Sequence, residues 1–278
     1  MGDVSLGDLP AVAIYTRLGV MAHQLGIDGF QLESSRNQLT AGVNAYARVY
    51  LDADFKRLAL RTFVMRPPML TRPGATYLEL ETNPVSGMPD STLFVFAARA
   101  LEEDLRLLAE PATGSNPQAV SAAVIDGLRT RLTAFPSAPV AVLGQRLVPR
   151  EANWLLGFEL GADSVAAVSA VAESLRVAPY QVAMLGALHE DLAHKGCLAV
   201  VGCTLNTIRQ ELTIEYRDLS WEQVITTTNR LRAMKSEGGF GVLAGAYNAD
   251  RAAYLEITFR ADEVPRVRAA VEHVSNVA

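Results

Sequence analysis

Several short segments of the chain alternate between apolar and polar residues, and segments with helical spacing of apolar residues separate them. The clearest alternation is at 43–52, where one strand face would hold Val43, Ala45, Ala47, Val49 and Leu51. The opposite face would hold Asn44, Tyr46, Arg48, Tyr50 and Asp52. Because 52–56 reads DADFK, a turn sequence, the pattern predicts an antiparallel hairpin over 43–66 with one polar face.

The rest of the first half predicts one more strand and three helices. An Asp8 cap and Pro10 in the first turn favour a helix over 8–25. The alternation ATYLELE predicts a strand at 75–81, between loops rich in proline and glycine. Apolar stripes predict helices over 93–110 and 118–135.

The second half predicts a more regular order. A hairpin is expected over 139–160, followed by helices over 163–177 and 179–194. A strand pair followed by a helix is then expected twice. The predicted strand pairs are 197–219 and 240–261, and the helices that follow them are 220–233 and 262–274.

These elements predict an α+β fold in which antiparallel hairpins alternate with helices as repeated strand-strand-helix units. Strands joined by such short turns must be antiparallel, which excludes a doubly wound parallel sheet. The sequence FPSAP at 135–139 separates two similar halves, predicted as domains 1–136 and 137–278.

Composition narrows the classes of function. With 278 residues, 50% of them hydrophobic, the chain has enough apolar surface for a large core. Its net charge of -5 provides no global attraction to nucleic acid. The N-terminal residues lack a secretory signal, and no apolar run is long enough to span a membrane, so we expect a cytoplasmic protein. Cys197 and Cys203 share one predicted strand, too far apart to form a disulfide.

The local motifs that suggest catalysis are incomplete. ALHEDLAHKG at 187–196 separates His189 from His194 by five residues, whereas a zinc-binding H-E-x-x-H motif needs four. On a helix, five residues place the two rings about 140° apart. Gly238 and Gly239 follow a predicted helix, where we expect them to end it and not to hold a phosphate. We therefore expect neither a metal nor a cofactor.

The most informative pattern is a set of polar residues distributed over the strands, with aliphatic residues on the opposite faces. It consists of Tyr46, Arg48, Tyr50, Arg61, Glu215, Arg217, Tyr254, Glu256 and Arg260. Two structures produce such a pattern: an open sheet with its polar face on the outside, or a closed barrel with its polar face lining a lumen.

The open form is similar to secretion-chaperone-like domains, in which a twisted sheet binds an extended client segment. This resemblance, the net negative charge of the chain and the absence of a catalytic motif together give our first hypothesis. This is a non-catalytic, chaperone-like assembly protein that presents a sheet face or edge to a protein partner, either another protein or a second copy in a homodimer.

The closed form resembles the aromatic prenyltransferase barrel, in which Lys, Arg and Tyr hold an allylic diphosphate in a solvent-filled lumen. This resemblance gives the competing hypothesis, an enzyme that uses a prenyl diphosphate. It implies an anion clamp formed by Arg48, Arg61, Arg217 and Arg260. Tyr46, Tyr50 and Tyr254 would shield a carbocation, and Glu215 would also contact the ligand.

Overall fold

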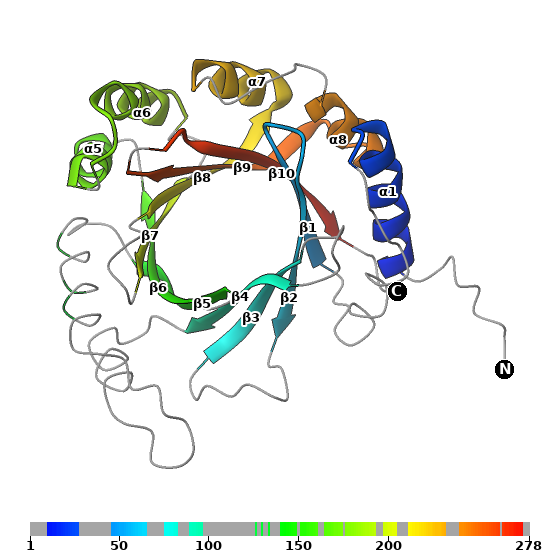
Figure 1. The fold of residues 1–278 in the computed structure, drawn as a ribbon, viewed down its shortest axis with the longest axis horizontal. Helices are drawn as coiled ribbons and strands as arrows, with labels where there is room; N and C mark the ends of the chain where they lie inside the picture. Colours follow the sequence, from blue (N-terminus) through cyan, green and yellow to red (C-terminus); the bar gives the residue numbers. More distant parts are fainter. Residues whose placement is uncertain are drawn as a thin grey trace, which may run out of the picture.

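The chain folds into an antiparallel barrel with helices on its outside (Figure 1). The computed structural model describes residues 10–27, 46–65, 75–82, 89–96, 126, 129, 133, 140–148, 151–160, 164–174, 176–192, 197–204, 211–231, 239–261 and 263–274. The strands are β1 (Tyr46–Asp52), β2 (Leu58–Met65), β3 (Ala75–Thr82), β4 (Pro89–Phe96), β5 (Val140–Val148), β6 (Glu151–Leu160), β7 (Cys197–Thr204), β8 (Glu211–Ser220), β9 (Arg251–Arg260) and β10 (Arg266–Val274).

Each described strand pairs with its neighbours in sequence, and the first and last strands close the ring. β1 pairs with β2 on one side and with β10 on the other, so the order runs β1-β10-β9-β8-β7-β6-β5-β4-β3-β2. All ten described pairings are antiparallel. Closure leaves no sheet edge available to a partner strand.

The helices whose bounds the structure gives lie outside the ring, along the arc from β7 through β9 and β10 to β1 (Figure 1). They are α1 (Pro10–Gln24), α5 (Val165–Ser174), α6 (Pro179–Leu192), α7 (Trp221–Arg230) and α8 (Gly239–Tyr247). The start of α7 is fixed by Ser220, whose hydroxyl accepts a hydrogen bond from the Gln223 backbone N–H at 3.2 Å in a capping box.

The hydrophobic core lies between the helices and the outer face of the barrel. Leu18 of α1, Val224 of α7 and Leu243 of α8 are fully buried in one cluster with outward-facing strand residues such as Ile214 and Ile257. The inward-facing residues between them on the same strands are polar or charged. The alternation in the sequence therefore separates the helix-packed face from the inner face of the barrel.

Most of the predicted elements are confirmed where the structure describes them. These include the helix near the N-terminus, the strand at 75–81 and the hairpins β1–β2 and β5–β6. The helices predicted at 163–177 and 179–194 are α5 and α6, and the first strand-strand-helix unit is β7–β8–α7. Residues 126, 129 and 133 are helical, within the helix predicted at 118–135. The helix predicted at 93–110 is wrong at its start, because residues 93–96 belong to β4 and pair with both β3 and β5.

The second predicted strand-strand-helix unit is wrong, because its first strand and its helix are exchanged. Residues 239–247 form helix α8, in which Phe240, Leu243 and Tyr247 recur at helical spacing and are buried. Residues 266–274, predicted as helical, form β10. Pairing with both β1 and β9 overrides the helical pattern there, since β10 is the strand that closes the ring.

Gly239 begins α8 and does not end a preceding helix. A Cβ atom at this position would lie 2.2 Å from the Phe55 ring, so only glycine permits this close packing. The boundary predicted near Pro136 falls at 134–139, outside the described residues. The division into two similar halves stays a prediction, although strands from both sides of that boundary contribute to one barrel.

Candidate functional site

The candidate site is the charged inner face formed by β8, β9, β10, β1, β2 and β3. Its side chains meet across the inside of the ring. Glu81 of β3 forms an ion pair with Arg268 of β10 at 2.7 Å, although β1 and β2 separate these strands in the sheet. Arg266 of β10 forms two hydrogen bonds with Asp52 of β1, at 2.9 and 3.0 Å.

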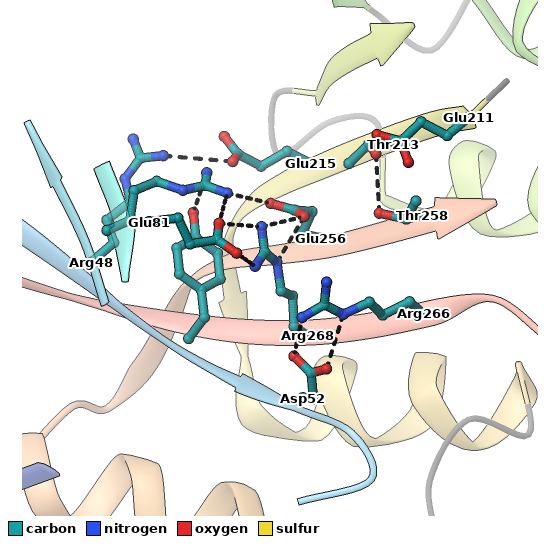
Figure 2. A network of polar contacts seen from close by, with 12 residues as sticks. Arg48, Asp52, Glu81, Glu211, Thr213, Glu215, Glu256, Thr258, Arg266 and Arg268 are labelled. Carbon is teal, nitrogen blue, oxygen red and sulfur yellow. Dashed lines mark hydrogen bonds and ion pairs between the residues drawn. The ribbon is translucent and has the colours of Figure 1, made fainter. Parts of the chain in front are cut away.

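Two arginines and two glutamates form the centre of this face (Figure 2). Arg268 binds Glu81 and donates a 2.7 Å hydrogen bond to Glu256, and Arg61 binds the same carboxylates at 2.8 and 3.3 Å. No more than 12% of any of these side chains is exposed. We call Arg61, Glu81, Glu256 and Arg268 the central quartet. Its formal charges cancel, so its arginines are already neutralised by protein carboxylates.

Tyr50 makes cation–π contacts with both arginines of the central quartet. The guanidinium carbons of Arg61 and Arg268 lie 4.5 and 4.4 Å from its ring centre, and Arg61 donates a 2.8 Å hydrogen bond to its hydroxyl oxygen. Burial raises the pKa of this phenol. Tyr50 therefore stays neutral and holds the quartet in place through cation–π contacts.

A second cluster lies nearer the end of the barrel where β8 ends and β9 begins. Arg48 stacks on Tyr254, with its guanidinium carbon 3.7 Å from the ring centre, and donates a 2.7 Å hydrogen bond to the Tyr254 hydroxyl. That hydroxyl donates a 2.5 Å hydrogen bond to Glu272. Arg48 and Tyr254 are therefore held rigidly together.

Glu215 lies between the second cluster and the central quartet. Its nearest cations are Arg48 at 3.6 Å and Arg217 at 3.8 Å, both beyond hydrogen-bonding distance. Only 8% of its side chain is exposed. Among the described residues, this buried carboxylate therefore has cations nearby but no hydrogen bond to fix its charge.

The surroundings of Glu215 and Glu256 shift the pKa values of the two carboxyls in opposite directions. Burial raises the pKa of Glu215, and the opposing effect of Arg48 does not cancel it. Burial acts in the same direction on Glu256, but Arg268 and Arg61 outweigh it and lower its pKa to about 2. Two carboxyls with pKa values displaced in opposite directions are typical of sites where one stays ionised and the other exchanges a proton.

A cavity of about 410 Å³ lies at this end of the barrel, within the usual range of roughly 300–1,000 Å³ for small-molecule sites. Its charged and aromatic lining residues are Arg217, Asp218, Arg251, Tyr254 and Glu272. Arg217 links the cavity to Glu215, because it lines the cavity and contacts that carboxylate. A ligand bound against Arg217 in the cavity would therefore lie close to Glu215.

The structure brings most of the predicted ligand-binding residues onto one face but not into one clamp. Arg48, Arg217, Tyr254 and Glu215 lie together, whereas Arg61 belongs to the central quartet and Tyr50 contacts it. The side chain of Tyr46 lies outside the described residues.

Arg260 lies at the other end of the face. It forms hydrogen bonds of 2.9 and 3.1 Å to Glu211 and an ion pair with Glu263. The four predicted arginines therefore do not form a single anion clamp.

Sequence reasoning missed Arg268, Glu81 and Glu272 as members of the site. Arg268 and Glu272 were assigned to a helix, where they could not line a barrel. The missed signal was the alternation of Arg266, Arg268, Ala270 and Glu272 with Val267, Ala269 and Val271. Glu81 was placed on the right strand, but its partner could not be identified without the closed ring.

His189 lies outside the barrel wall and away from this face. It is fully buried on α6, and its Nδ1 atom lies 3.2 Å from the Tyr216 hydroxyl. His194 falls outside the described residues. Within the described part of the chain, no three His, Cys, Asp or Glu side chains gather in a way that could hold a metal ion.

Solved structures of prenyltransferases share this fold. A 5-dimethylallyltryptophan synthase from Streptomyces coelicolor superposes with a TM-score of 0.66 at 11% identity, covering 97% of this chain and 99% of that chain. The prenyltransferase PriB, in complex with L-tryptophan and dimethylallyl thiolodiphosphate, gives a TM-score of 0.64 at 11% identity, covering 95% and 96%. No family model and no curated protein sequence matches the chain.

These findings correct the first hypothesis from the sequence. A non-catalytic, chaperone-like protein would present an open sheet face or edge, whereas this sheet is closed and its polar face lies inside. Solved structures that share the fold include a 5-dimethylallyltryptophan synthase and the prenyltransferase PriB, both of them enzymes. Among the described helices, none is long and apolar enough to cross a membrane.

Proposed function

We propose that the protein is a prenyltransferase that transfers a prenyl group from its diphosphate to an aromatic acceptor within the barrel. The fold likeness supports the class of enzyme. The observation that carries the proposal is Glu215, a buried lumen carboxylate with a raised pKa beside Arg48 and Arg217. A base of this kind is what prenylation of an aromatic ring requires.

The reaction needs three functions from the lumen. The bond between the prenyl carbon and the diphosphate oxygen breaks, and the electron pair leaves with the diphosphate. A new bond then forms between the prenyl carbon and the aromatic acceptor. The acceptor finally loses a proton to a base. The site must therefore bind an anion, shield an allylic cation and accept a proton.

Arg217 and Arg251, the guanidinium groups that line the cavity, are the proposed diphosphate ligands. Arg48 lies beside them, bound to Tyr254. The Tyr254 ring would shield the allylic cation by a cation–π interaction, since it lines the same cavity. Glu215 would accept the acceptor's proton.

The central quartet has a different proposed role. Because Arg61 and Arg268 are neutralised by Glu81 and Glu256, displacing a carboxylate to bind diphosphate there would be costly. We propose that the quartet braces the lumen wall. A cytoplasmic location, a homodimer and the division into two halves remain predictions from the sequence.

The test is an assay of prenyl transfer with dimethylallyl diphosphate and a panel of aromatic acceptors that includes L-tryptophan, the acceptor bound in one of the similar structures. Mass spectrometry should detect a product heavier than the acceptor by one prenyl group. Glu215→Gln should form the product at least about 100-fold more slowly than wild type, while Glu211→Gln, on the same strand at the other end of the face, should form it at the wild-type rate. Failure of the wild-type protein with every donor and acceptor class would contradict the proposal.

A further inference from the structure

Arg217 both contacts Glu215 and lines the cavity. Its side chain is 42% exposed and lines the cavity, and its Nε atom lies 3.8 Å from the Glu215 carboxylate. That Nε atom is buried and, among the described groups, has no hydrogen-bond partner. An anion entering the cavity therefore finds a guanidinium that is held only by this long ion pair.

Arg48, the other cation near Glu215, is held more firmly. It donates a hydrogen bond to the Tyr254 hydroxyl and stacks on the Tyr254 ring, and it also lies 3.6 Å from Glu272. Arg217 is accordingly the guanidinium that can turn towards an anion at the lowest cost. Rotation of Arg217 into the cavity would leave Glu215 with Arg48 alone at ion-pair distance.

The other groups that face Glu215 do not compensate for this loss. Tyr50 of β1 is neutral and Arg61 of β2 is engaged with Glu81 and Glu256. Glu256 of β9, directly opposite on the neighbouring strand, is itself negative. With an anion added nearby, the electrostatic balance at Glu215 shifts towards its protonated form.

We propose that an anion bound at Arg217 strengthens Glu215 as a base by drawing this cation away from it. The inference rests on the proposed function and adds a regulatory link: the donor diphosphate raises the proton affinity of Glu215, and the fraction of Glu215 that stays ionised is the stronger base for the acceptor's proton. The link is reciprocal, so protonation of Glu215 also tightens binding of the anion.

The test measures the protons taken up when inorganic pyrophosphate binds. Titration calorimetry in buffers of different ionisation enthalpy gives this number for wild type, Glu215→Gln and Glu211→Gln. Protonation of pyrophosphate itself is common to all three proteins and cancels. We expect wild type and Glu211→Gln to take up a larger fraction of a proton than Glu215→Gln at pH 7.

Affinity provides a second readout. The neutral Glu215→Gln side chain no longer competes for Arg217, so this variant should bind pyrophosphate more tightly than wild type at pH 8. The gain should be on the order of tenfold, within the usual range for coupling between two sites. Its affinity should also vary less with pH than that of wild type.

Equal proton uptake by wild type and Glu215→Gln would overturn the inference and leave the proposed function standing if prenyl transfer is observed. Absence of pyrophosphate binding to wild type would also overturn it, and the transfer assay would then decide the proposed function separately. If Glu215→Gln does not fold, Arg217→Gln replaces it. That variant should bind pyrophosphate more weakly and take up less of a proton than wild type, and unchanged values would overturn the inference.

Discussion

Glu215 and Glu256 lie directly opposite each other on β8 and β9, yet the first has a raised pKa and the second a pKa of about 2. Like charges at facing positions of a sheet are destabilising unless cations intervene. Here Arg268 and Arg61 are committed to Glu256, and Glu215 has only the longer ion pairs with Arg48 and Arg217. This unequal distribution of arginines distinguishes the two carboxylates.

The first prediction concerns the pH dependence of prenyl transfer. A base works only when ionised, so the rate of wild type should fall as the pH decreases through the raised pKa of Glu215. Glu215→Gln should reduce the rate by about 100- to 10,000-fold and remove this acidic limb. Rate–pH profiles of wild type, Glu215→Gln and Glu211→Gln test this expectation. A Glu215→Gln variant with the wild-type rate would show that another group is the base.

The second prediction concerns the acid stability of the barrel. The pKa of Glu256 is lowered in the folded state from about 4.5 to about 2, so its stabilising effect is complete above pH 4.5. The effect is lost progressively as the pH falls from about 4.5 towards 2. Urea unfolding between pH 6 and pH 3 should show a smaller decrease in unfolding free energy for Glu256→Gln than for wild type. Equal slopes would contradict the assigned role of Glu256.

The third prediction compares a buried and an exposed arginine. Arg268→Met would leave Glu81 and Glu256 with Arg61 as their remaining quartet partner, and should cost roughly 3–5 kcal/mol of unfolding free energy. Arg251→Met removes an ion pair with Asp218 whose side chains are 45% and 68% exposed, and should cost roughly 0–1 kcal/mol. Chemical denaturation measures both changes. Similar losses in the two variants would show that the quartet does not brace the barrel.

The fourth prediction concerns two glycines of α8. Gly239→Ala would place its Cβ 2.2 Å from the Phe55 ring, which packs edge-on against Phe240, so the variant should lose about 1–3 kcal/mol. Gly245 has no atom within 4 Å of its ideal Cβ position. Gly245→Ala should therefore stabilise the helix by roughly 0.5–1 kcal/mol. Thermal unfolding of both variants tests whether α8 begins against Phe55, and a stabilised Gly239→Ala would contradict that packing.

The strands of the candidate site could be predicted to different extents from the sequence. The alternation around Arg48 and Tyr50 was strong enough to place both residues on a polar strand face, and the same held for Glu215 and Arg217. The segment of Arg268 and Glu272 was ambiguous, since its apolar residues fit either a helix or a strand. Local pattern could not resolve that ambiguity, because β10 is a strand through its pairing with β1, far away in sequence.

The sequence by itself determined the antiparallel character of the hairpins, the polar and apolar faces of the strands, and most helices outside 239–274. These features depend on residue spacing within each segment. Only the tertiary structure decided that the sheet is closed, because closure depends on pairing between β1 and β10, more than 200 residues apart. Closure turned the polar face inward and brought Arg268 of β10 to Glu81 of β3. It left Glu215, between Arg48 and Arg217, as the buried carboxylate in the described face that is suited to exchange a proton.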